Sequence, residues 1–491
     1  MSRATLIAAI STATNLDGRE IAALDASAGW LEVRGNGHTQ TDPDWFRDHF
    51  DGGLIFSLRD ETELSASGRQ SVLKAAARRY ELVELDVRHD LGTRTLQAVP
   101  PEKRIVAWRG LLKRGSLDQM LDRVLSVEAR LYKFTPVADN AGDVAALLRL
   151  LQLRGRSDLI SYAEGAAGFW SRFITPRLSA RIVCGLVRPE RGTPDEPSIK
   201  ELNDDYGLPD LPSVGEIYGI VGNPVRHSLS PRLHNAAYRA LGLRSLFLPF
   251  QVESFEDFWR DVVQSGVFES LGMTLRGLTV VSPYKEAALL TAGESSAVTR
   301  RVDAANIFVR SNGHWRADTT DPEGVVLALR GRGISLRRRR TAVIGCGGAG
   351  RAVAAALDEA GAHVTLVNRG LERGHRAVEL LGLPFVPLGE FDPEGFSMVV
   401  NATPVGRDGS DLPICIEGLA RDAIVVDLVY GANPTPFISK SVYRGLDAVD
   451  GREVLLIQAQ RQFEMMTGRE MPAGLARDVL GTEAALRCAA V

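Results

Sequence analysis

The first two hundred residues alternate between short apolar, β-branched runs and longer stretches whose apolar residues recur at helical spacing. The short runs predict eight strands, at Leu6–Ser11, Trp30–Arg34, Leu54–Arg59, Leu82–Arg88, Arg104–Arg109, Arg130–Thr135, Leu159–Ala163 and Arg181–Leu186. The longer stretches predict helices, among them Ser65–Tyr80, Leu117–Glu128 and Val144–Arg154. This alternation predicts an α/β protein that begins with a (β/α)8 barrel over residues 1–190.

Charged residues gather where the predicted barrel strands end. They are Glu32, Arg34, Arg59, Arg88, Arg109, Lys133 and, after the seventh strand, Arg172. Barrels of this kind place their chemistry at the carboxyl ends of the strands. A cluster rich in arginine around one lysine fits a substrate that carries a carboxylate.

A stretch rich in Pro, Gly, Asp and Glu predicts a linker or lid over residues 191–215. After it, a predicted strand from Ile217 to Val221 runs into a Gly-Asn-Pro turn, which Ser228 and Ser230 follow. Ser230 precedes Pro231, as an N-cap precedes a proline in the first helical turn. Two serines at i and i+2 of an extended segment can point the same way, which would offer paired hydroxyls to a ligand with hydroxyls or a carboxylate.

A glycine-rich turn later in the chain has the pattern of a dinucleotide-binding unit. The strand that begins at Thr341 leads into Gly345, Gly347 and Gly350, in G-x-G-x-x-G spacing, and a helix follows. The flanking strand and helix favour a nucleotide site over a structural turn, with phosphates at the helix N-terminus.

The next strand, which begins at Val364, ends in Asn368-Arg369 instead of an acidic residue. A carboxylate there would bind the ribose hydroxyl of NAD and repel a 2′-phosphate, whereas Arg369 and Arg373 favour that phosphate. The sequence therefore predicts NADP as the cofactor.

Composition narrows the class of protein. The chain has 491 residues, 45% of them hydrophobic, and a formal net charge of −3, which predict a globular protein of two or three domains. Neither nucleic acid nor a membrane is the expected partner, and the run Arg337–Arg340 is read as a solvated loop. The four cysteines have no metal-binding spacing, so we expect no metal and a reducing cytoplasm. The apolar run at the N-terminus is too short to predict a signal peptide.

Several short segments, in a fixed order, carry a family resemblance. They are Gly222-Asn-Pro-Val-x-His-Ser-x-Ser-Pro, Ser282-Pro-Tyr-Lys285-Glu, Ala304-Ala-Asn306, Asp318-Thr-Thr-Asp321, Gly345-Cys-Gly-Gly-Ala-Gly, Asn368-Arg369, Asn401-Ala-Thr403-Pro, Asp427-Leu-Val-Tyr430 and Gln458-Ala459. Through them, the chain from about Glu216 onward resembles shikimate dehydrogenases. The resemblance implies a substrate-binding domain over 216–320, completed by 450–491, and an inserted NADP-binding Rossmann domain over 321–449.

The resemblance also implies roles, which agree with what the residue types can do. Lys285 and Asp321 would form the catalytic pair, because an ammonium beside a carboxylate can protonate a developing alkoxide when a ketone is reduced. Asp321 is also read as an N-cap before Pro322. The residues implied to bind substrate are Ser228, Ser230, Asn306, Asp321, Tyr430 and Gln458. Those implied to bind the cofactor are Gly345, Gly347, Gly348, Ala349, Gly350, Asn368, Arg369, Arg373, Thr403 and Gly451.

Two departures from the family pattern concern substrate choice. Thr279 stands where the family has asparagine, and Val281 where it has a threonine that contacts a substrate hydroxyl. A valine cannot donate a hydrogen bond, so a hydroxyl facing it would lose about 1–3 kcal/mol. A quinate-type dehydrogenase is therefore kept as an alternative. Pro322 also replaces a usual glycine.

The first half resembles type I 3-dehydroquinate dehydratases, and the fusion resembles the bifunctional enzymes of plants. The matches include Glu32-x-Arg34, Arg59 with Glu63, Lys133 in the place of the Schiff-base lysine, and Gly168-Phe-Trp-Ser-Arg172. A lysine inside a barrel is costly unless it is paired or functional, which favours a catalytic origin for Lys133.

Other positions predict that the dehydratase activity is impaired. Arg109 replaces the family's histidine, and an arginine stays protonated and cannot act as a base. Glu196 replaces the lid glutamine, and His89 is a weak substitute for the missing histidine. A fully bifunctional enzyme and a non-catalytic binding barrel remain alternatives, and the oligomeric state stays open.

Overall fold

The computed structural model describes residues 2–11, 17–35, 42–58, 64–111, 115–189, 195–409, 411–431 and 433–480. The chain folds into two compact units. The first unit comprises residues 1–217 and 244–274, and the second comprises 218–243 and 275–491.

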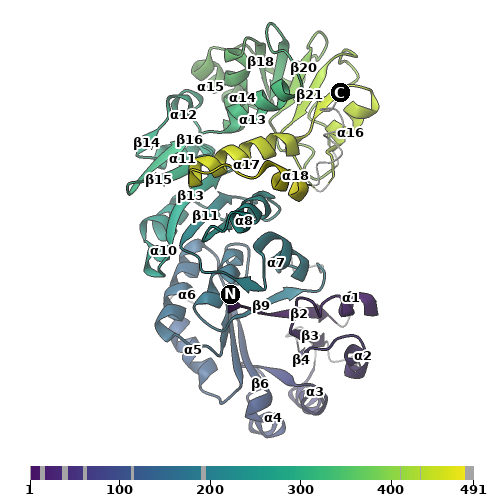
Figure 1. Cartoon of the computed structure of the whole chain (residues 1–491), viewed down its shortest axis with the longest axis vertical. Coiled ribbons are helices and arrows are strands. Elements are labelled where there is room, and N and C mark those ends of the chain that lie inside the picture. Colours follow the sequence, from purple (N-terminus) through teal and green to yellow (C-terminus); the bar gives the residue numbers. More distant parts are fainter. Residues whose placement is uncertain are drawn as a thin grey trace. The chain divides into compact units, whose positions relative to one another are not determined.

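Eight parallel strands, in the order β8-β7-β6-β5-β4-β3-β2-β9, form the centre of the first unit (Figure 1). They are β2 (Thr5–Ser11), β3 (Trp30–Gly35), β4 (Gly53–Leu58), β5 (Leu82–Asp86), β6 (Arg104–Leu111), β7 (Leu131–Val137), β8 (Leu159–Ser161) and β9 (Ile182–Leu186). Just before β9, the Ala180 N–H donates to the Leu159 carbonyl on β8 at 2.9 Å, which brings the two ends of the sheet together. Each of the eight strands predicted from the sequence pattern is present, and the predicted fold class is confirmed.

Helices follow most of these strands. They are α1 (Gly18–Ala22), α2 (Pro43–Arg47), α3 (Ala66–Arg79), α4 (Thr93–Ala98), α5 (Leu117–Leu125) and α6 (Ala141–Arg154), with 3₁₀ turns at Pro101–Lys103, Phe169–Phe173 and Thr175–Arg177. Helix α6 shows why such segments begin and end where they do. Asn140 and Asp143 form a reciprocal capping box at its start, and Gly155 ends it with a φ of 56°.

Part of the segment expected to be a linker, residues 191–215, forms regular secondary structure. Helix α7 (Ile199–Tyr206) begins where the Ser198 hydroxyl accepts the Glu201 N–H at 3.1 Å, and strand β10 (Asp210–Leu211) pairs with β1 (Ser2–Arg3). Tyr206 stacks on Phe173 of the barrel at 3.5 Å between ring centroids. The polar composition of the segment hid this helix, because only one side of it is apolar and buried.

Residues 244–274, predicted to belong to the substrate-binding domain, group with the barrel. They contain β12 (Ser245–Gln251), α9 (Phe255–Phe258), a π-helical turn (Trp259–Gln264) and α10 (Val267–Ser270). Aromatic packing accounts for the grouping, since Trp170 lies 5.1 Å from Phe250 and 5.6 Å from Phe268. The limits given for the individual domains stay a prediction.

The second unit opens with a mixed sheet in which β11, β13, β15, β16 and β14 follow one another. These strands are β11 (Glu216–Gly222), β13 (Thr274–Val280), β14 (Glu294–Ser295), β15 (Ile307–Ser311) and β16 (His314–Asp318). The helices of this part are α8 (Ser230–Ala240), α11 (Lys285–Thr291), α12 (Ala297–Val302) and α13 (Asp321–Gly331), together with α17 (Gly451–Thr467) and α18 (Ala473–Leu480) from the end of the chain. Helix α17 packs on α13 and α8.

A second, fully parallel sheet has the order β19-β18-β17-β20-β21-β22. Its elements are β17 (Arg340–Ile344), α14 (Gly348–Glu359), β18 (His363–Asn368), α15 (Leu371–Leu381), β19 (Phe385–Pro387), β20 (Met398–Asn401), β21 (Ile424–Asp427), α16 (Pro436–Tyr443) and β22 (Asp447–Val449). The chain order reverses between β17 and β20, which makes this the doubly wound topology of dinucleotide-binding domains. Ligands bind such sheets at the carboxyl ends of the strands, beside that reversal.

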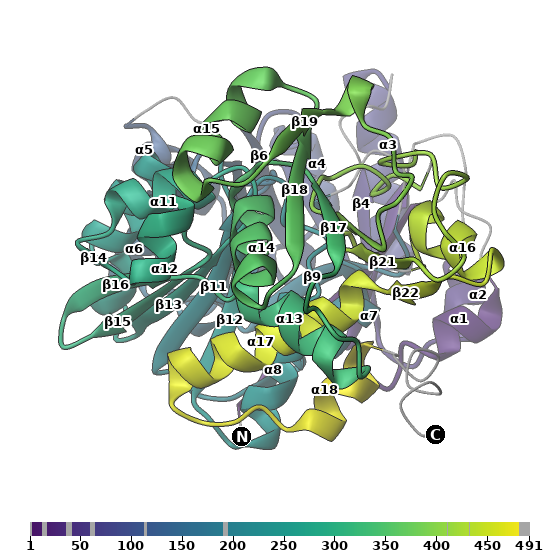
Figure 2. The ribbon, with the colours of Figure 1, turned by 90° about the horizontal axis from the view of Figure 1, so that it is seen from above.

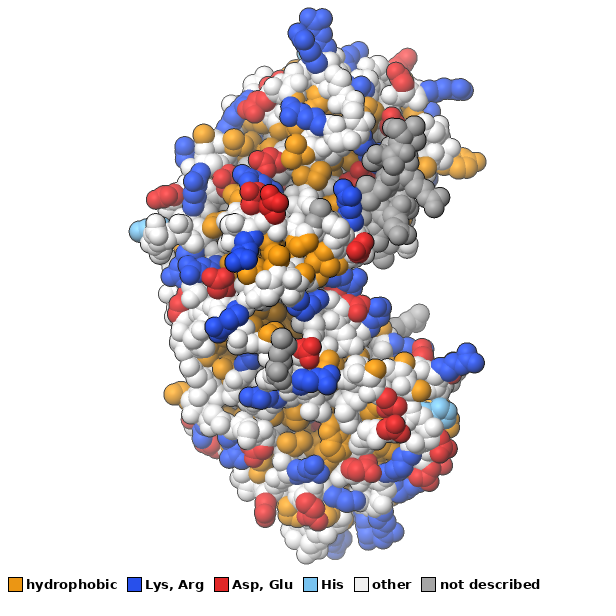
Figure 3. Space-filling view, viewed as in Figure 1, with side chains coloured by type: hydrophobic (Ala, Val, Ile, Leu, Met, Phe, Trp, Pro, Cys, Tyr) orange, Lys and Arg blue, Asp and Glu red, His pale blue; other side chains and the backbone are white. Residues whose placement is uncertain are grey.

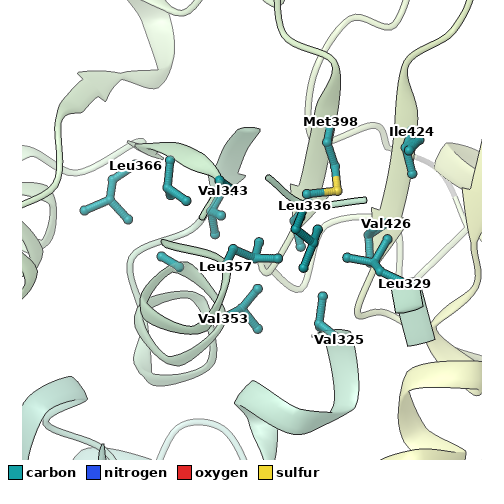
Figure 4. Close-up of a cluster of buried hydrophobic side chains, with 14 of the residues drawn as sticks. Val325, Leu329, Leu336, Val343, Val353, Leu357, Leu366, Met398, Ile424 and Val426 are labelled. Atoms are coloured by element: carbon teal, nitrogen blue, oxygen red, sulfur yellow. The ribbon is translucent and has the colours of Figure 1, made fainter. Parts of the chain in front are cut away.

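The core of this Rossmann part is apolar and continuous. In Figure 4, Val343, Leu366 and Met398 on the sheet point toward Val353 and Leu357 of α14. Figure 2 shows α14 lying against β17 and β18, with α13 beside it. This packing holds the N-terminus of α14 at the carboxyl end of β17.

Charges of both signs share the face of the molecule drawn in Figure 3. On the face drawn in Figure 3, basic and acidic side chains are interspersed, in keeping with the net charge of −3. Within the part of the chain that the structure describes, none of the helices combines the length and apolar character that a membrane crossing requires.

Candidate active site

Two residues far apart in the sequence form the centre of the site in the second unit. Lys285 is the first residue of α11 and Asp321 the first residue of α13. The Lys285 Nζ lies 2.5 Å from Asp321 Oδ2, with 15% and 6% of the two side chains exposed. A charge-assisted hydrogen bond of this kind, largely removed from water, holds an ammonium group in a fixed direction.

The other oxygen of Asp321 organises the surrounding polar groups. Its Oδ1 accepts hydrogen bonds from Asn306 Nδ2 and from Gln458 Nε2, both at 2.9 Å. Asn306 follows a turn before β15, and Gln458 lies on α17. Four of the predicted site residues are therefore in direct contact.

A further layer of this network was missed at the level of sequence. The Thr320 hydroxyl accepts hydrogen bonds from Asn306 Nδ2 at 3.1 Å and from Gln462 Nε2 at 3.0 Å. Gln462 Oε1 in turn accepts the hydroxyl of Thr279 at 3.2 Å. Gln462 is one helical turn after Gln458, so the i, i+4 spacing could have revealed it. Thr279, which departs from the family pattern, therefore has a partner in this network.

The two serines of the turn after β11 are next to each other, but their roles in the helix differ from the prediction. Ser230 is the first residue of α8, and its N–H donates to Ser228 Oγ at 3.2 Å. Helix α8 therefore begins one residue earlier than expected. The hydroxyl that accepts an N–H at its start is that of Ser228, not that of Ser230. Asp321 likewise lies inside α13, after Thr320. The Ser228 hydroxyl is hydrogen-bonded to Tyr430, whose pKa is raised by burial.

The glycine-rich turn fits a bound diphosphate. Gly345 has a φ of 106°, which favours glycine, and a Cβ on Gly350 would lie 1.8 Å from the Gly345 carbonyl oxygen. Gly347 caps α14, and a Cβ there would meet only open space. Gly348 and Ala349 form the first turn of α14. The backbone thus leaves free room at a helix N-terminus, where phosphates bind.

The predicted ribose side of the cofactor site lies at the end of β18. Asn368 Oδ1 accepts the Cys346 N–H of the glycine turn at 3.1 Å. Arg369 and Arg373 are both exposed. Within the described residues neither guanidinium has an ion-pair partner, so both can meet a phosphate.

Thr403 and Gly451 are held close to the same edge of the sheet. The Thr403 hydroxyl donates to Asn401 Oδ1 at 2.7 Å, and Asn401 Nδ2 donates to the buried Asp427 at 2.9 Å. Gly451 starts α17, and a Cβ there would come within 2.4 Å of the Val429 carbonyl oxygen. Packing alone therefore requires glycine at position 451.

In the first unit, the barrel interior contains a chain of ion pairs. Lys133 Nζ on β7 lies 3.2 Å from Glu32 on β3 and 3.0 Å from Glu84 on β5, and all three are buried. Arg109 on β6 donates to the other oxygen of Glu84 at 2.7 Å. Burial alone would lower the pKa of Lys133, but the charges of Glu32 and Glu84 outweigh it and hold that pKa above its ordinary value.

The arginines of the barrel differ in what they contact. Arg34 Nη2 donates to Glu196, the residue in the predicted lid position, at 2.8 Å. Arg172 is 2% exposed and lies over the ring of Tyr162 at 4.0 Å, and its Nε and Nη1 have no hydrogen-bond partner among the described residues. These donors are therefore available to an anion, as the predicted carboxylate contact of Arg172 requires. Arg59 and Glu63 lie outside the described residues.

Comparison with known proteins agrees with this geometry. A shikimate dehydrogenase (NADP(+)) of Thermococcus kodakarensis is 36% identical over 266 residues, which cover 53% of this chain and 94% of that protein. The chain belongs to the shikimate dehydrogenase family. The family model "Shikimate dehydrogenase substrate binding domain" matches residues 220–308. Among solved structures, the chain is similar to the crystal structure of shikimate dehydrogenase from Aquifex aeolicus, with 29% sequence identity and a TM-score of 0.50. The match covers 54% of this chain and 97% of the Aquifex chain.

The first half has its own match. The family model "Type I 3-dehydroquinase" covers residues 45–210. The bifunctional 3-dehydroquinate dehydratase/shikimate dehydrogenase, chloroplastic, of Arabidopsis thaliana is 28% identical over 382 residues. That alignment spans 73% of this chain but only 62% of the plant protein. Both resemblances inferred from the sequence are confirmed.

Proposed function

We propose that this protein is an NADP-dependent shikimate dehydrogenase, which interconverts 3-dehydroshikimate and shikimate and is fused to a barrel with impaired dehydratase activity. The observation that carries the proposal is the contact between Lys285 and Asp321 in a chain of this family. A ketone can be reduced only if a proton reaches the oxygen as hydride reaches the carbon. The Lys285 ammonium is the donor available for that proton.

Each neighbouring side chain has a defined task in this scheme. Asp321 holds the Lys285 ammonium toward the substrate oxygen and stabilises its charge. Gln458 donates to Asp321 through Nε2 and would present its Oε1 to a ring hydroxyl. Asn306 already donates to both Asp321 and Thr320, so it would meet a ring hydroxyl through Oδ1, which also accepts the Thr320 N–H at 2.8 Å. Ser228, Ser230 and Tyr430 supply hydroxyl groups for the substrate carboxylate.

The cofactor site is assigned to the end of the Rossmann sheet. Bound there, NADPH supplies the hydride. Gly345, Gly347, Gly348, Ala349 and Gly350 would hold its diphosphate at the N-terminus of α14. Asn368, Arg369, Arg373, Thr403 and Gly451 would surround the remainder, with the two arginines facing the 2′-phosphate. Free arginines there favour NADP over NAD.

The test is a panel of substrates and cofactors on the intact protein. Shikimate and quinate are each oxidised with NADP and with NAD, and formation of the reduced cofactor is followed by absorbance. We expect shikimate with NADP to give the highest kcat/KM. No oxidation of either acid would refute the proposal. A preference for quinate would favour the alternative that Val281 suggests, because its methyl groups replace a hydroxyl donor at the substrate site.

The dehydratase turnover of the barrel is proposed to be impaired, because its lysine is held as a cation and its proton shuttle is replaced. A Schiff base requires a neutral amine, and Glu32 and Glu84 both keep the Lys133 ammonium charged. Arg109 occupies the place of the proton shuttle and cannot accept a proton. Treatment with 3-dehydroquinate and borohydride should leave the peptide that contains Lys133 unmodified. A trapped adduct there would favour the fully bifunctional alternative, whereas ligand binding without turnover would favour a binding barrel.

The remaining parts of the proposal concern partners and location. We expect small carboxylated ring compounds as ligands, and neither nucleic acid nor membrane. Three cysteines in the described residues, Cys184, Cys346 and Cys415, are free thiols. Their state is compatible with the cytoplasmic location predicted from the sequence.

A further inference from the structure

A fully buried arginine lies between the cofactor turn and the catalytic lysine. Arg351, in the first turns of α14, has 0% of its surface exposed. Its Nε donates to the Val302 carbonyl at 2.8 Å, and its Nη2 donates to the Asp303 carbonyl at 2.9 Å. Both acceptors are at the C-terminal end of α12, where a cation is favoured by the helix dipole.

The remaining nitrogen of the guanidinium reaches two other segments. Arg351 Nη1 donates to the Cys346 carbonyl in the glycine-rich turn at 3.1 Å and to Glu286 Oε1 at 2.8 Å. Asp303, the other carboxylate nearby, is 4.0 Å away. Because a buried charge is costly without a close counter-ion, the pair with Glu286 is the interaction that makes Arg351 tolerable there.

Glu286 is directly bonded in the chain to Lys285, and both belong to the first turn of α11. The glycine turn also presses against this lysine, since a Cβ on Gly348 would lie 3.2 Å from the Lys285 Cβ. The Lys285 carbonyl accepts the Ala305 N–H at 2.8 Å, and Ala305 is the residue before Asn306. Helix α13, which carries Asp321, packs on α14. A displacement of α11 relative to α14 would therefore move the ammonium away from Asp321.

We propose that Glu286 and Arg351 are positioning residues, whose ion pair fixes Lys285 relative to the dinucleotide-binding turn. Neither side chain needs to touch the substrate, and the inference rests on the proposed dehydrogenase function. The pair acts on the geometry of proton delivery, so it should affect kcat far more than the binding of shikimate or of NADP. Small misplacements of reacting groups are sufficient for large losses in rate.

The first test is Glu286→Gln, which keeps the size of the side chain and all three carbonyl acceptors of Arg351. We expect kcat for shikimate oxidation to fall by about 10- to 100-fold. The KM for shikimate and the Kd for NADPH, measured by fluorescence titration, should stay at their wild-type values. Glu286→Asp, which keeps the charge, should restore part of the lost kcat. The matched control is Glu359→Gln, because Glu359 lies on α14, as Arg351 does, but pairs with Arg301 at the surface.

The outcomes separate this inference from the proposed function. A wild-type protein that oxidises neither shikimate nor quinate would refute the function itself. An active wild type together with an unchanged kcat in Glu286→Gln would overturn only the positioning role. Equal losses in Glu286→Gln and Glu286→Asp, or a rise in KM that accounts for the whole effect, would also overturn it. Thermal unfolding of each variant shows whether a lower kcat comes from misfolding. If the decrease in the folded fraction equals the decrease in kcat, the positioning role is contradicted.

Discussion

The substitution Asp321→Asn tests the centre of the site, because it removes one charge and almost no volume. In the structure, three donors converge on this carboxylate: Lys285 on Oδ2, and Asn306 and Gln458 on Oδ1. An asparagine has one acceptor oxygen and one NH₂ group. In either orientation of its amide, the NH₂ group faces a donor, and at least one buried hydrogen bond is lost.

The expected size of the effect follows from these contacts. An unsatisfied buried donor costs about 1–3 kcal/mol, so the free energy of unfolding should fall by that amount. The proton donor would also lose the group that directs it, and kcat should fall by about 10²–10⁴-fold. The assay follows NADPH absorbance during shikimate oxidation, with urea unfolding measured in parallel.

Glu323→Gln is the matched control for this experiment. Glu323 is also in the first turn of α13, but it is exposed and pairs with Arg461 at 3.1 Å. We expect wild-type kinetics from it. A kcat for Asp321→Asn within about tenfold of wild type would refute the reasoning, because even the smallest loss expected for a missing acid–base partner is larger.

Two other predictions concern the barrel and the effect of acid. Arg109→His should raise the dehydration of 3-dehydroquinate, measured as enone absorbance, by about 10²-fold or more, because it restores a group that can accept a proton; no gain would mean that the Lys133 pocket is inactive for a different reason. Burial lowers the pKa of His234 to about 3, whereas a histidine in the unfolded chain titrates at about 6.5. The unfolded chain therefore binds the extra proton between these values, and the free energy of unfolding should fall as the pH falls from ~6.5 toward 3. In His234→Phe, the free energy of unfolding, measured with urea on the intact protein, should fall less steeply over this pH range. An unchanged pH dependence would rule out His234 as its source.

Much of the fold was predictable because it follows from local pattern. Strand β5 illustrates this, since its residues are all buried and read as one apolar run interrupted by Glu84 and Asp86. Glu32 and Arg34 alternate with apolar neighbours on β3, which placed both on one face of the strand. Helix α7 escaped prediction because its eight residues have few apolar positions and lie in a Pro-rich segment.

The site was predictable only as far as the motifs extended. Lys285 and Asp321 were found through resemblance, and their contact across 36 residues was a consequence of folding. Thr320, Gln462 and Arg351 were given no role, because only the folded chain shows which polar groups meet. The i, i+4 spacing from Gln458 to Gln462 was the one available signal in the sequence. Arg351 reads as an ordinary surface arginine of an amphipathic helix until the surrounding segments close over it.

The measurement that tests the central claim most directly is the reduction of 3-dehydroshikimate by NADPH in the wild type and in Lys285→Ala. The account predicts rapid NADPH consumption by the wild type, a loss of about 10²-fold or more in kcat for the variant, and the same affinity for NADPH in both. Consumption by Lys285→Ala at the wild-type rate would contradict it.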